Sequence, residues 1–453
     1  MKIIVVGCGK IGATVIESLI NEGHDVTAVD SNPQILSETC NIYDTIGVCG
    51  NGTDVSTLSD AGADKADLFV AATGSDEFNM LSCFLAKKMG SKNTVARIRN
   101  PEYNDQSLGF LRQNLDLSLS INPERLMAHE IFNLLKFPSA IKTETFSHRN
   151  FEMVEFILKD SSPICDMSLI DMRKAYDAAF LVCAVTRGDE VFIPSGDFVL
   201  AAGDRIGIIA SPAELHKLFK KLIPQQKQLK SIIIAGASRT TYYLAKMLLA
   251  AGNSVKIIDP DKTRCEELCE GLPKAVVICG DPANDDIMLE EGLTDTDAFV
   301  SLTGIDEENI LLAFSATNHG VSKVVSKVNR QGFASVAEKL GLDCILNPKD
   351  LAANVIVRYA RALENSIESS QVETLYKLMD GKAELLEFII KSDNDATNIP
   401  LKTLRLKPNV LIAGIIRRRK PIIPAGDDML QSGDRVIVLS AGHKMNDITD
   451  ILR

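Results

Sequence analysis

The sequence contains no tryptophan, and aromatic residues make up only 5% of its 453 positions. It also lacks an apolar run approaching the roughly 20 residues that a membrane-spanning helix requires. The first residues, Met1 to Ile4, enter a strand pattern at once, whereas a signal peptide would begin with a charged stretch followed by an apolar one. We therefore expect a protein that stays in the cytoplasm.

Ten cysteines are present, but none belongs to a C-x-x-C pair of the kind that binds zinc or exchanges thiols. Cys265 and Cys269 come closest, because their spacing places both on one face of a helix. No second pair follows them, and the six histidines are isolated from one another. We therefore expect buried, reduced cysteines and no metal site.

The charge balance is acidic, with 49 Lys and Arg residues against 60 Asp and Glu residues and a formal net charge of −11. The basic residues are dispersed, whereas nucleic acid and anionic lipid are bound by concentrated basic surfaces. Both are therefore poor candidates as partners. A content of 45% hydrophobic and 24% charged residues is that of an ordinary folded protein, and the length predicts two to four domains.

The chain contains an internal repeat whose period is half its length. The run Ile3 to Gly7 recurs as Ile232 to Gly236, and Asp30 recurs 229 residues later as Asp259. Later pairs are displaced by 230, as in Thr73-Gly74 and Thr303-Gly304. The loops are repeated as well as the apolar pattern, so both halves should have the same architecture.

Each half opens with strand-like runs that alternate with helix-period stretches, which predicts βαβ units and a doubly wound parallel sheet of the α/β class, a Rossmann-type domain. In the first half these runs are Lys2 to Val6, Asp25 to Val29, Leu68 to Ala71 and Thr94 to Arg97. Each half closes with short strands and Gly/Pro turns, which predicts a small α+β domain. The expected domains are 1–140, 141–225, 226–368 and 369–453, with a polar join at 224–228.

A Rossmann fingerprint follows the first expected strand, in the order Gly7-Cys8-Gly9-Lys10-Ile11-Gly12. Gly7 permits the tight turn, Gly9 lets the backbone approach a pyrophosphate, and Gly12 lets the helix pack on the strand. The amides and dipole of that helix N-terminus favour an anion. Asp30 ends the second strand, where its carboxylate would bind the adenosine ribose and repel a 2′-phosphate. NAD(H) or an adenine nucleotide is therefore favoured over NADP(H).

A second loop should meet the same carboxyl edge of the sheet, after the strand that ends at Ala71. Thr73 and Gly74 of this loop should line the ligand. Asp76 has two interpretations, a cap of the following helix and a ligand contact. Arg97 ends the next strand and would reach phosphate, with a solvated surface position as the alternative.

The second half departs from the fingerprint, because Ser238 and Thr241 replace the second and third glycines. Their side chains occupy space that the pyrophosphate contact and the helix packing would use. The other expected ligand positions are kept, at Asp259, Gly280, Thr303 and Lys327. Two interpretations stay open, a modified adenine-nucleotide site and an empty structural copy.

An oxidoreductase needs a group that exchanges a proton with substrate beside the nicotinamide, and no persuasive set of such residues is present. Tyr242 and Lys246 have the spacing of the Tyr/Lys pair of short-chain dehydrogenases. They follow the altered glycine loop directly, whereas those enzymes carry the pair far downstream, so we attribute the match to chance. Binding without catalysis is the expected function, with an NAD-dependent oxidoreductase of duplicated Rossmann domains as the alternative.

The repeated unit resembles the RCK (KTN) domains that regulate potassium channels and transporters, and the resemblance spans the whole chain. It rests on the glycine fingerprint, on Asp30, and on the runs Thr73 to Met80, Pro194 to Asp197 and Gly203 to Arg205. It implies a non-enzymatic regulatory subunit that binds NAD(H), and also ATP or ADP, and forms a homo-oligomer, a tetrameric ring, on the inner face of the membrane. The implied partner is an integral-membrane potassium transporter similar to TrkH or TrkG, gated by the nucleotide.

One basic run is unusual for this chain, Arg417-Arg418-Arg419-Lys420, in the turn that matches residues 187–190 of the first half. It could contact an acidic partner or a second-messenger nucleotide, whereas a solvated hairpin turn is the simpler interpretation. A cyclic-dinucleotide sensor acting through the C-terminal domains is therefore a further alternative function.

Overall fold

The computed structural model describes residues 1–103, 105–146, 150–223, 229–367, 372–378, 382–443, 445 and 447–453. The chain divides into two compact units, and each unit draws on both halves of the sequence. The first unit comprises Met1–Phe132 and Leu229–Ala360, and the second comprises Asn133–Gln228 and Arg361–Arg453. The polar join expected at 224–228 lies outside the described residues, and the four-domain division stays a prediction.

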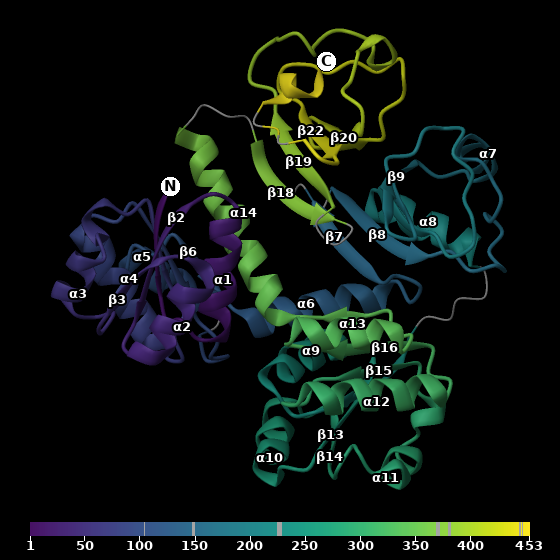
Figure 1. The fold of residues 1–453 in the computed structure, drawn as a ribbon. Coiled ribbons are helices and arrows are strands. Elements are labelled where there is room, and N and C mark those ends of the chain that lie inside the picture. Colours follow the sequence, from purple (N-terminus) through teal and green to yellow (C-terminus); the bar gives the residue numbers. More distant parts are fainter. Residues whose placement is uncertain are drawn as a thin grey trace. The chain divides into compact units, whose positions relative to one another are not determined.

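The first half contributes a six-stranded parallel sheet flanked by helices to the first unit (Figure 1). Its strand order is β3-β2-β1-β4-β5-β6. Its strands are β1 Lys2–Val6, β2 Asp25–Asp30, β3 Ile46–Cys49, β4 Leu68–Ala71, β5 Asn93–Arg97 and β6 Leu119–Ile121. Its helices are α1 Lys10–Asn21, α2 Pro33–Tyr43, α3 Val55–Asp60, the short η1 Ala63–Lys65, α4 Asp76–Met89, α5 Asp105–Asn114 and α6 Pro123–Lys136. This order reverses between β1 and β4, the point at which doubly wound sheets bind ligands.

The second half contributes a matching parallel sheet, with the order β14-β13-β12-β15-β16-β17. Its strands are β12 Ser231–Ala235, β13 Ser254–Asp259, β14 Val276–Cys279, β15 Ala298–Ser301, β16 Lys323–Lys327 and β17 Ile345–Leu346. Its helices are α9 Arg239–Ala250, α10 Lys262–Gly271, α11 Asp285–Glu290, η3 Leu293–Asp295, α12 Asp306–Asn318, α13 Gln331–Lys339 and α14 Pro348–Ile367. The predicted Rossmann-type α/β class is confirmed for both halves.

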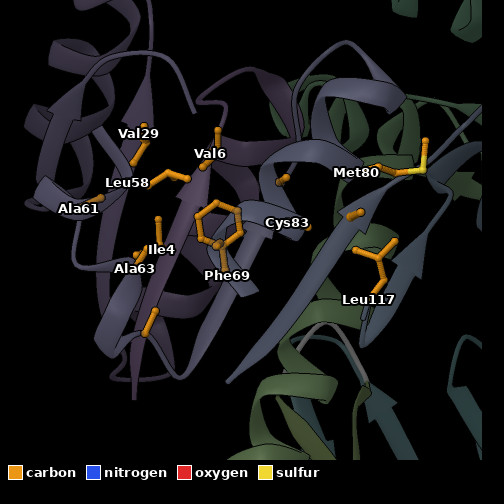
Figure 2. Packing of buried hydrophobic residues seen from close by; sticks show 14 of the residues in the cluster. Ile4, Val6, Val29, Leu58, Ala61, Ala63, Phe69, Met80, Cys83 and Leu117 are labelled. Carbon is orange, nitrogen blue, oxygen red and sulfur yellow. The ribbon is translucent and has the colours of Figure 1, made fainter. Parts of the chain in front are cut away.

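Apolar side chains cover both faces of the first parallel sheet, as expected for strands with helices on either side. On one face, Ile4, Val6 and Phe69 pack against Leu58 of α3 (Figure 2). The intervening residues of β1 are equally buried on the opposite face. Burying one such large side chain contributes about 1.5–3 kcal/mol, so this packing fixes the carboxyl edge of the sheet and the loops that emerge from it.

The second unit contains two five-stranded antiparallel sheets, ordered β10-β9-β11-β8-β7 and β18-β19-β22-β20-β21. The first has β7 Lys142–Phe146, β8 Phe151–Ile157, α7 Leu169–Ala175, β9 Phe180–Arg187, β10 Glu190–Phe192, β11 Arg205–Ala210 and α8 Pro212–Leu222. The second has β18 Val372–Leu378, β19 Ala383–Ile389, η5 Leu401–Thr403, β20 Val410–Arg417, β21 Lys420–Ile422, β22 Arg435–Ser440 and η6 Ile448–Ile451. The predicted α+β class is confirmed, and one apolar cluster joins both sheets through residues such as Phe151, Ile209, Ala413 and Leu439.

The repeated Gly-Asp-Arg motif stabilises a hairpin in each of these sheets. Asp204 is fully buried and receives hydrogen bonds from Arg187 Nε at 2.7 Å and from the Ala201 amide at 2.8 Å. Burial raises the pKa of this carboxyl, but the bonds from Arg187 and Ala201 outweigh burial and lower the pKa overall. Asp434 accepts hydrogen bonds from Arg417 in the same way, at 2.9 and 2.7 Å. In the basic run 417–420, Arg418, Arg419 and Lys420 are exposed, whereas Arg417 is half-buried.

Candidate nucleotide site

The glycine loop between β1 and α1 needs Gly7 and Gly12 for its own packing. Gly7 has a positive φ of 92°, and a Cβ there would lie 2.9 Å from the Thr73 Cγ2 atom. A Cβ on Gly12 would lie 1.7 Å from the Gly7 carbonyl oxygen, which no side chain can do. These two glycines therefore let the strand, the second loop and the helix come together.

Gly9 has a different role, because a Cβ there would meet no described atom within 4 Å. Gly9 is the N-cap residue of α1, and in the described part of the chain no side chain caps this helix. The amides of Lys10, Ile11 and Gly12 form the first turn, and such amides attract anions, helped by the helix dipole. The space in front of Gly9 is thus suited to a phosphate group.

Asp30 at the end of β2 holds the glycine loop. Its Oδ2 accepts the Cys8 amide at 2.7 Å, and its Oδ1 accepts the Asn32 amide at 2.8 Å. The Cys8 thiol is buried, and burial, with smaller effects of Asp30 and Cys40, raises its pKa to about 12. Cys8 therefore contributes its backbone to the loop, and its thiol stays protonated.

The loop after β4 is held by Asn79, a residue that sequence reasoning did not single out as a site residue. Asn79 is fully buried, and its Oδ1 accepts the Thr73 amide at 2.9 Å while its Nδ2 donates to the Arg97 carbonyl at 2.9 Å. Asn309 makes the same bonds to Thr303 and Lys327, at 2.8 and 3.1 Å. The sequence signal for Asn79 was the internal repeat, because Asn79 and Asn309 stand at matching positions of the two halves.

The interpretation of Asp76 as a helix cap is wrong. Ser75 is the N-cap residue of α4, and its hydroxyl accepts the Phe78 amide at 3.2 Å. The Asp76 Oδ2 instead accepts the amides of Arg99 and Asn100, both at 2.8 Å, which fixes the chain after β5. Contact between Asp76 and a ligand stays a prediction.

Arg97 and its counterpart Lys327 lie at the ends of β5 and β16. Arg97 Nη1 donates to the Thr73 carbonyl at 3.3 Å, and Nη2 lies 3.6 Å from Glu124. Its buried Nε has no hydrogen-bond partner among the described residues. Burial is the main reason that the pKa values of both Arg97 and Lys327 are lowered. Both charged groups would gain from an anion placed beside them.

A cleft of about 1150 Å³ joins these features within the first unit. Ten of the predicted site residues line it: Gly7, Gly9, Lys10, Ile11, Asp30, Thr73, Gly74, Arg97, Ser238 and Lys327. Besides Lys327, its lining includes three cations of the second half, namely Arg239, Arg264 and Lys349. With Lys10, Arg97 and Lys327 these make six cationic side chains, against three carboxylates at Asp30, Glu124 and Glu267. The cleft is therefore locally basic in an acidic chain, which favours an anionic ligand.

Other predicted site residues do not line this cleft. They are Cys8, Gly12, Asp76, Asp259, Gly280 and Thr303. Gly280 donates its amide to the Asp259 carbonyl at 3.0 Å, and a Cβ on Gly280 would approach Ile287 at 3.4 Å. The participation of these six predicted residues in ligand binding stays a prediction.

In the altered glycine loop of the second half, the two residues that replace glycine cap helix α9. Ser238 is the N-cap residue of α9, and its hydroxyl accepts the Thr241 amide at 3.2 Å, in a reciprocal capping box. The Thr241 hydroxyl donates to the Gly236 carbonyl at 2.5 Å. Thr241 stands at the position of Gly12, where the packing of the first half leaves no room for a side chain. An α9 amide that could bind a phosphate is thus already satisfied by protein.

Replacing Ser238 with alanine should weaken the first turn of α9 by about 1 kcal/mol, because the helix loses its N-cap. We expect the Thr241 amide to exchange hydrogen roughly fivefold faster, measured by hydrogen–deuterium exchange. Gly9→Ala is the matched control, since it removes no cap from α1. Equal protection of Thr241 in the parent chain and in Ser238→Ala would contradict this role of the serine.

Tyr242 and Lys246, the pair that resembles a dehydrogenase motif, both belong to α9. Tyr242 lines the cleft, but the Lys246 ammonium lies over the tyrosine ring, 5.9 Å from its centre. A lysine that lowers the pKa of a catalytic tyrosine acts near the hydroxyl. The observed contact is instead a cation–π interaction.

Family models match the sequence in a repeating pattern. The TrkA-N domain model matches residues 3–110 and 232–348, and the TrkA-C domain model matches residues 153–223 and 385–453. A Trk system potassium uptake protein TrkA homolog from Archaeoglobus fulgidus is 30% identical over 453 residues, which cover all of both chains. The TrkA protein of Vibrio alginolyticus is 28% identical, over 98% of this chain and 96% of its own.

Solved structures share the fold over nearly the whole chain. A GsuK channel bound to NAD has a TM-score of 0.65 at 16% identity, covering 97% of this chain and 77% of the channel. The GsuK RCK domain has a TM-score of 0.64, also at 16% identity, covering 97% of this chain and 92% of the domain. At 16% identity, the similarity to these structures supports the fold and nothing further.

The duplicated Rossmann and α+β folds define a protein of tandem RCK domains. The chain belongs to the TrkA family of Trk system potassium uptake proteins. Over the ranges that the structure describes, no helix is both long enough and apolar enough to span a bilayer.

Proposed function

We propose that this chain is a regulatory subunit that gates a membrane potassium-uptake transporter in response to NAD(H), ATP or ADP bound in the cleft. The observation that carries the proposal is the N-terminus of α1 at Gly9, which no side chain of the described residues caps and which lines a cleft with six cationic side chains. The family membership supplies the transport process, since the relatives are named as potassium uptake proteins. Solved GsuK structures with NAD and with ADP support these nucleotide classes.

The proposed assembly is a homo-oligomer, a tetrameric ring, on the inner face of the membrane. Its partner would be an integral-membrane transporter similar to TrkH or TrkG. A subunit without a conduction pathway can act only by binding two states of the transporter with different affinity. The cleft is lined by both halves of the chain, so a ligand there would favour one arrangement of the halves.

Calorimetric titration of the purified chain with NADH, NAD, ATP and ADP tests the binding step directly. We expect saturable binding of at least one of them, weakened in Asp30→Ala, because Asp30 holds the Cys8 amide and lines the cleft. Asp259→Ala is the matched control in the second half, where the carboxylate holds the Ala237 amide but lies outside the cleft lining. No heat of binding with any of the four nucleotides would refute the proposal.

The chain should have no turnover of its own, because the sequence offers no persuasive acid–base set for a dehydrogenase and the relatives are named as potassium uptake proteins. Purified protein with NADH should cause no substrate-dependent loss of nicotinamide absorbance across a panel of keto acids and aldehydes. Sustained oxidation that disappears in Tyr242→Phe would instead support the alternative of an NAD-dependent oxidoreductase.

A further inference from the structure

Three cysteines of the second half surround the carboxyl ends of β13 and β14. Cys265 lies in the first turn of α10, Cys269 one turn later, and Cys279 is the last residue of β14. The expectation of buried cysteines is wrong for Cys269 and Cys279, which are exposed, as is Cys49 in the first half. Their exposure follows from their positions, on the outer side of a helix and at the edge strand of each parallel sheet.

The fold brings the thiols of Cys265 and Cys279 together. Cys279 pairs with Asp259 in the register of β13 and β14. The Cys265 sulfur lies 3.3 Å from the Asp259 carbonyl and 3.8 Å from the Ile278 carbonyl. The Cys279 sulfur lies 3.8 Å from the carbonyl of Pro260, the residue after Asp259. Both sulfurs therefore lie within 4 Å of the carbonyls of two consecutive residues at the end of β13.

The two thiols differ in access, as an attacking and a resolving cysteine do. Cys279 is exposed, whereas Cys265 is only 5% exposed. The first half has no such pair, because Leu36 stands at the position of Cys265 and Cys49 at that of Cys279. The pair is thus a property of the second half alone.

We propose that Cys265 and Cys279 form a thiol-exchange site that low-molecular-weight disulfides oxidise to an intramolecular disulfide. The Cys279 thiolate attacks one sulfur of the small disulfide, which forms a mixed disulfide and releases one small thiolate. Cys265 then loses its proton to solvent and attacks the Cys279 sulfur, which forms the protein disulfide and releases the second small thiolate. Two protein thiols are oxidised, and one small disulfide is reduced to two thiols.

The disulfide would fix α10 against the end of β14. The same helix carries Arg264, Glu267 and Leu268, which line the cleft. Oxidation should therefore restrain one wall of the cleft, a consequence that rests on the proposed nucleotide-binding function. The thiol chemistry itself does not depend on a nucleotide.

The second exchange step should depend on pH in a defined way. Burial, with smaller effects of Cys279 and Asp259, raises the pKa of the Cys265 thiol to about 11. Below that pKa the thiolate fraction rises about tenfold per pH unit, so closure of the mixed disulfide should accelerate about 100-fold between pH 7 and pH 9. A pH-independent closure rate would contradict Cys265 as the resolving thiol.

The test treats the full chain with oxidised and reduced glutathione in varied ratio and maps disulfides by mass spectrometry of peptides. We expect a Cys265–Cys279 crosslink in the parent chain. Cys265→Ser should instead retain glutathione on Cys279, about tenfold more than the parent chain does. Cys279→Ser should leave Cys265 reduced, and Cys49→Ser, the matched first-half variant, should form the crosslink normally.

The following outcomes would overturn the proposal: glutathione that stays on Cys279 of the parent chain, a crosslink between Cys265 and Cys269, or no reaction. Circular dichroism of each serine variant verifies that its fold is intact. Repeating the exchange with saturating NADH or ADP separates the two proposals. A crosslink that forms at a nucleotide-independent rate supports the thiol site while counting against its coupling to the cleft.

Discussion

Replacing Gly9 with valine should reduce nucleotide affinity by roughly 100-fold or more while leaving the fold intact. A valine side chain would project into the space in front of α1, where no described atom lies within 4 Å of the added Cβ. It would therefore displace the phosphate from the first-turn amides of α1. Each hydrogen bond to a charged group contributes about 1.5–3 kcal/mol, so losing two of them accounts for the expected change.

Calorimetric titration with the nucleotide that binds most tightly to the parent chain measures this effect, and thermal unfolding verifies the fold. Ser238→Val is the matched control, because it occupies the equivalent position of the capped second loop. Gly12→Ala is unsuitable, since its Cβ would collide with the Gly7 carbonyl and disturb folding. Undiminished affinity in Gly9→Val, with loss of affinity in Ser238→Val, would move the primary site to the second half.

Much of the fold could be predicted because its signals are local. The predicted strands Lys2 to Val6 and Leu68 to Ala71 agree with β1 and β4. The other two predicted strands of the first half differ from β2 and β5 by one residue at one end. The doubly wound parallel sheet could be predicted from alternating strand and helix patterns, since right-handed crossovers leave few other arrangements. The turn at Gly7 and the close packing at Gly12 could be predicted because the positive φ of Gly7 and the contact of Gly12 with the Gly7 carbonyl both arise within one loop.

The remainder of the site depends on contacts between segments far apart in the chain. Nothing in the spacing of Arg239 or Arg264 indicates that both line the cleft with Gly9. The capping box of Ser238 and Thr241 is local, and its spacing could have been recognised from the sequence. The prediction considered the two residues only as replacements of glycine. Asp76 was ambiguous because first-turn acids are common, and only the tertiary structure brings the Arg99 amide to its carboxylate.

The two loops suggest why duplication would be useful to a regulatory subunit. The first half leaves its helix N-terminus open at Gly9, whereas the second half satisfies its own with Ser238. Arg239 of the second half nevertheless lines the same cleft as Lys10, its counterpart. In the proposed function, the first half binds the anion at Gly9 and the second half adds four of the six cations, so a ligand bound to both would link them, as a sensor requires.

Potassium flux through the partner transporter should change some 5–150-fold with nucleotide, which corresponds to the usual coupling of about 1–3 kcal/mol between two sites. The measurement is potassium or rubidium uptake into vesicles that contain the transporter, with and without this chain, over a series of NADH, NAD, ATP and ADP concentrations. Asp30→Ala should weaken the response, because it releases the Cys8 amide and removes a carboxylate from the cleft. Asp259→Ala, at the equivalent position outside the cleft lining, should change it less. The regulatory function is refuted if flux ignores both protein and nucleotide in vesicles where the two proteins demonstrably associate.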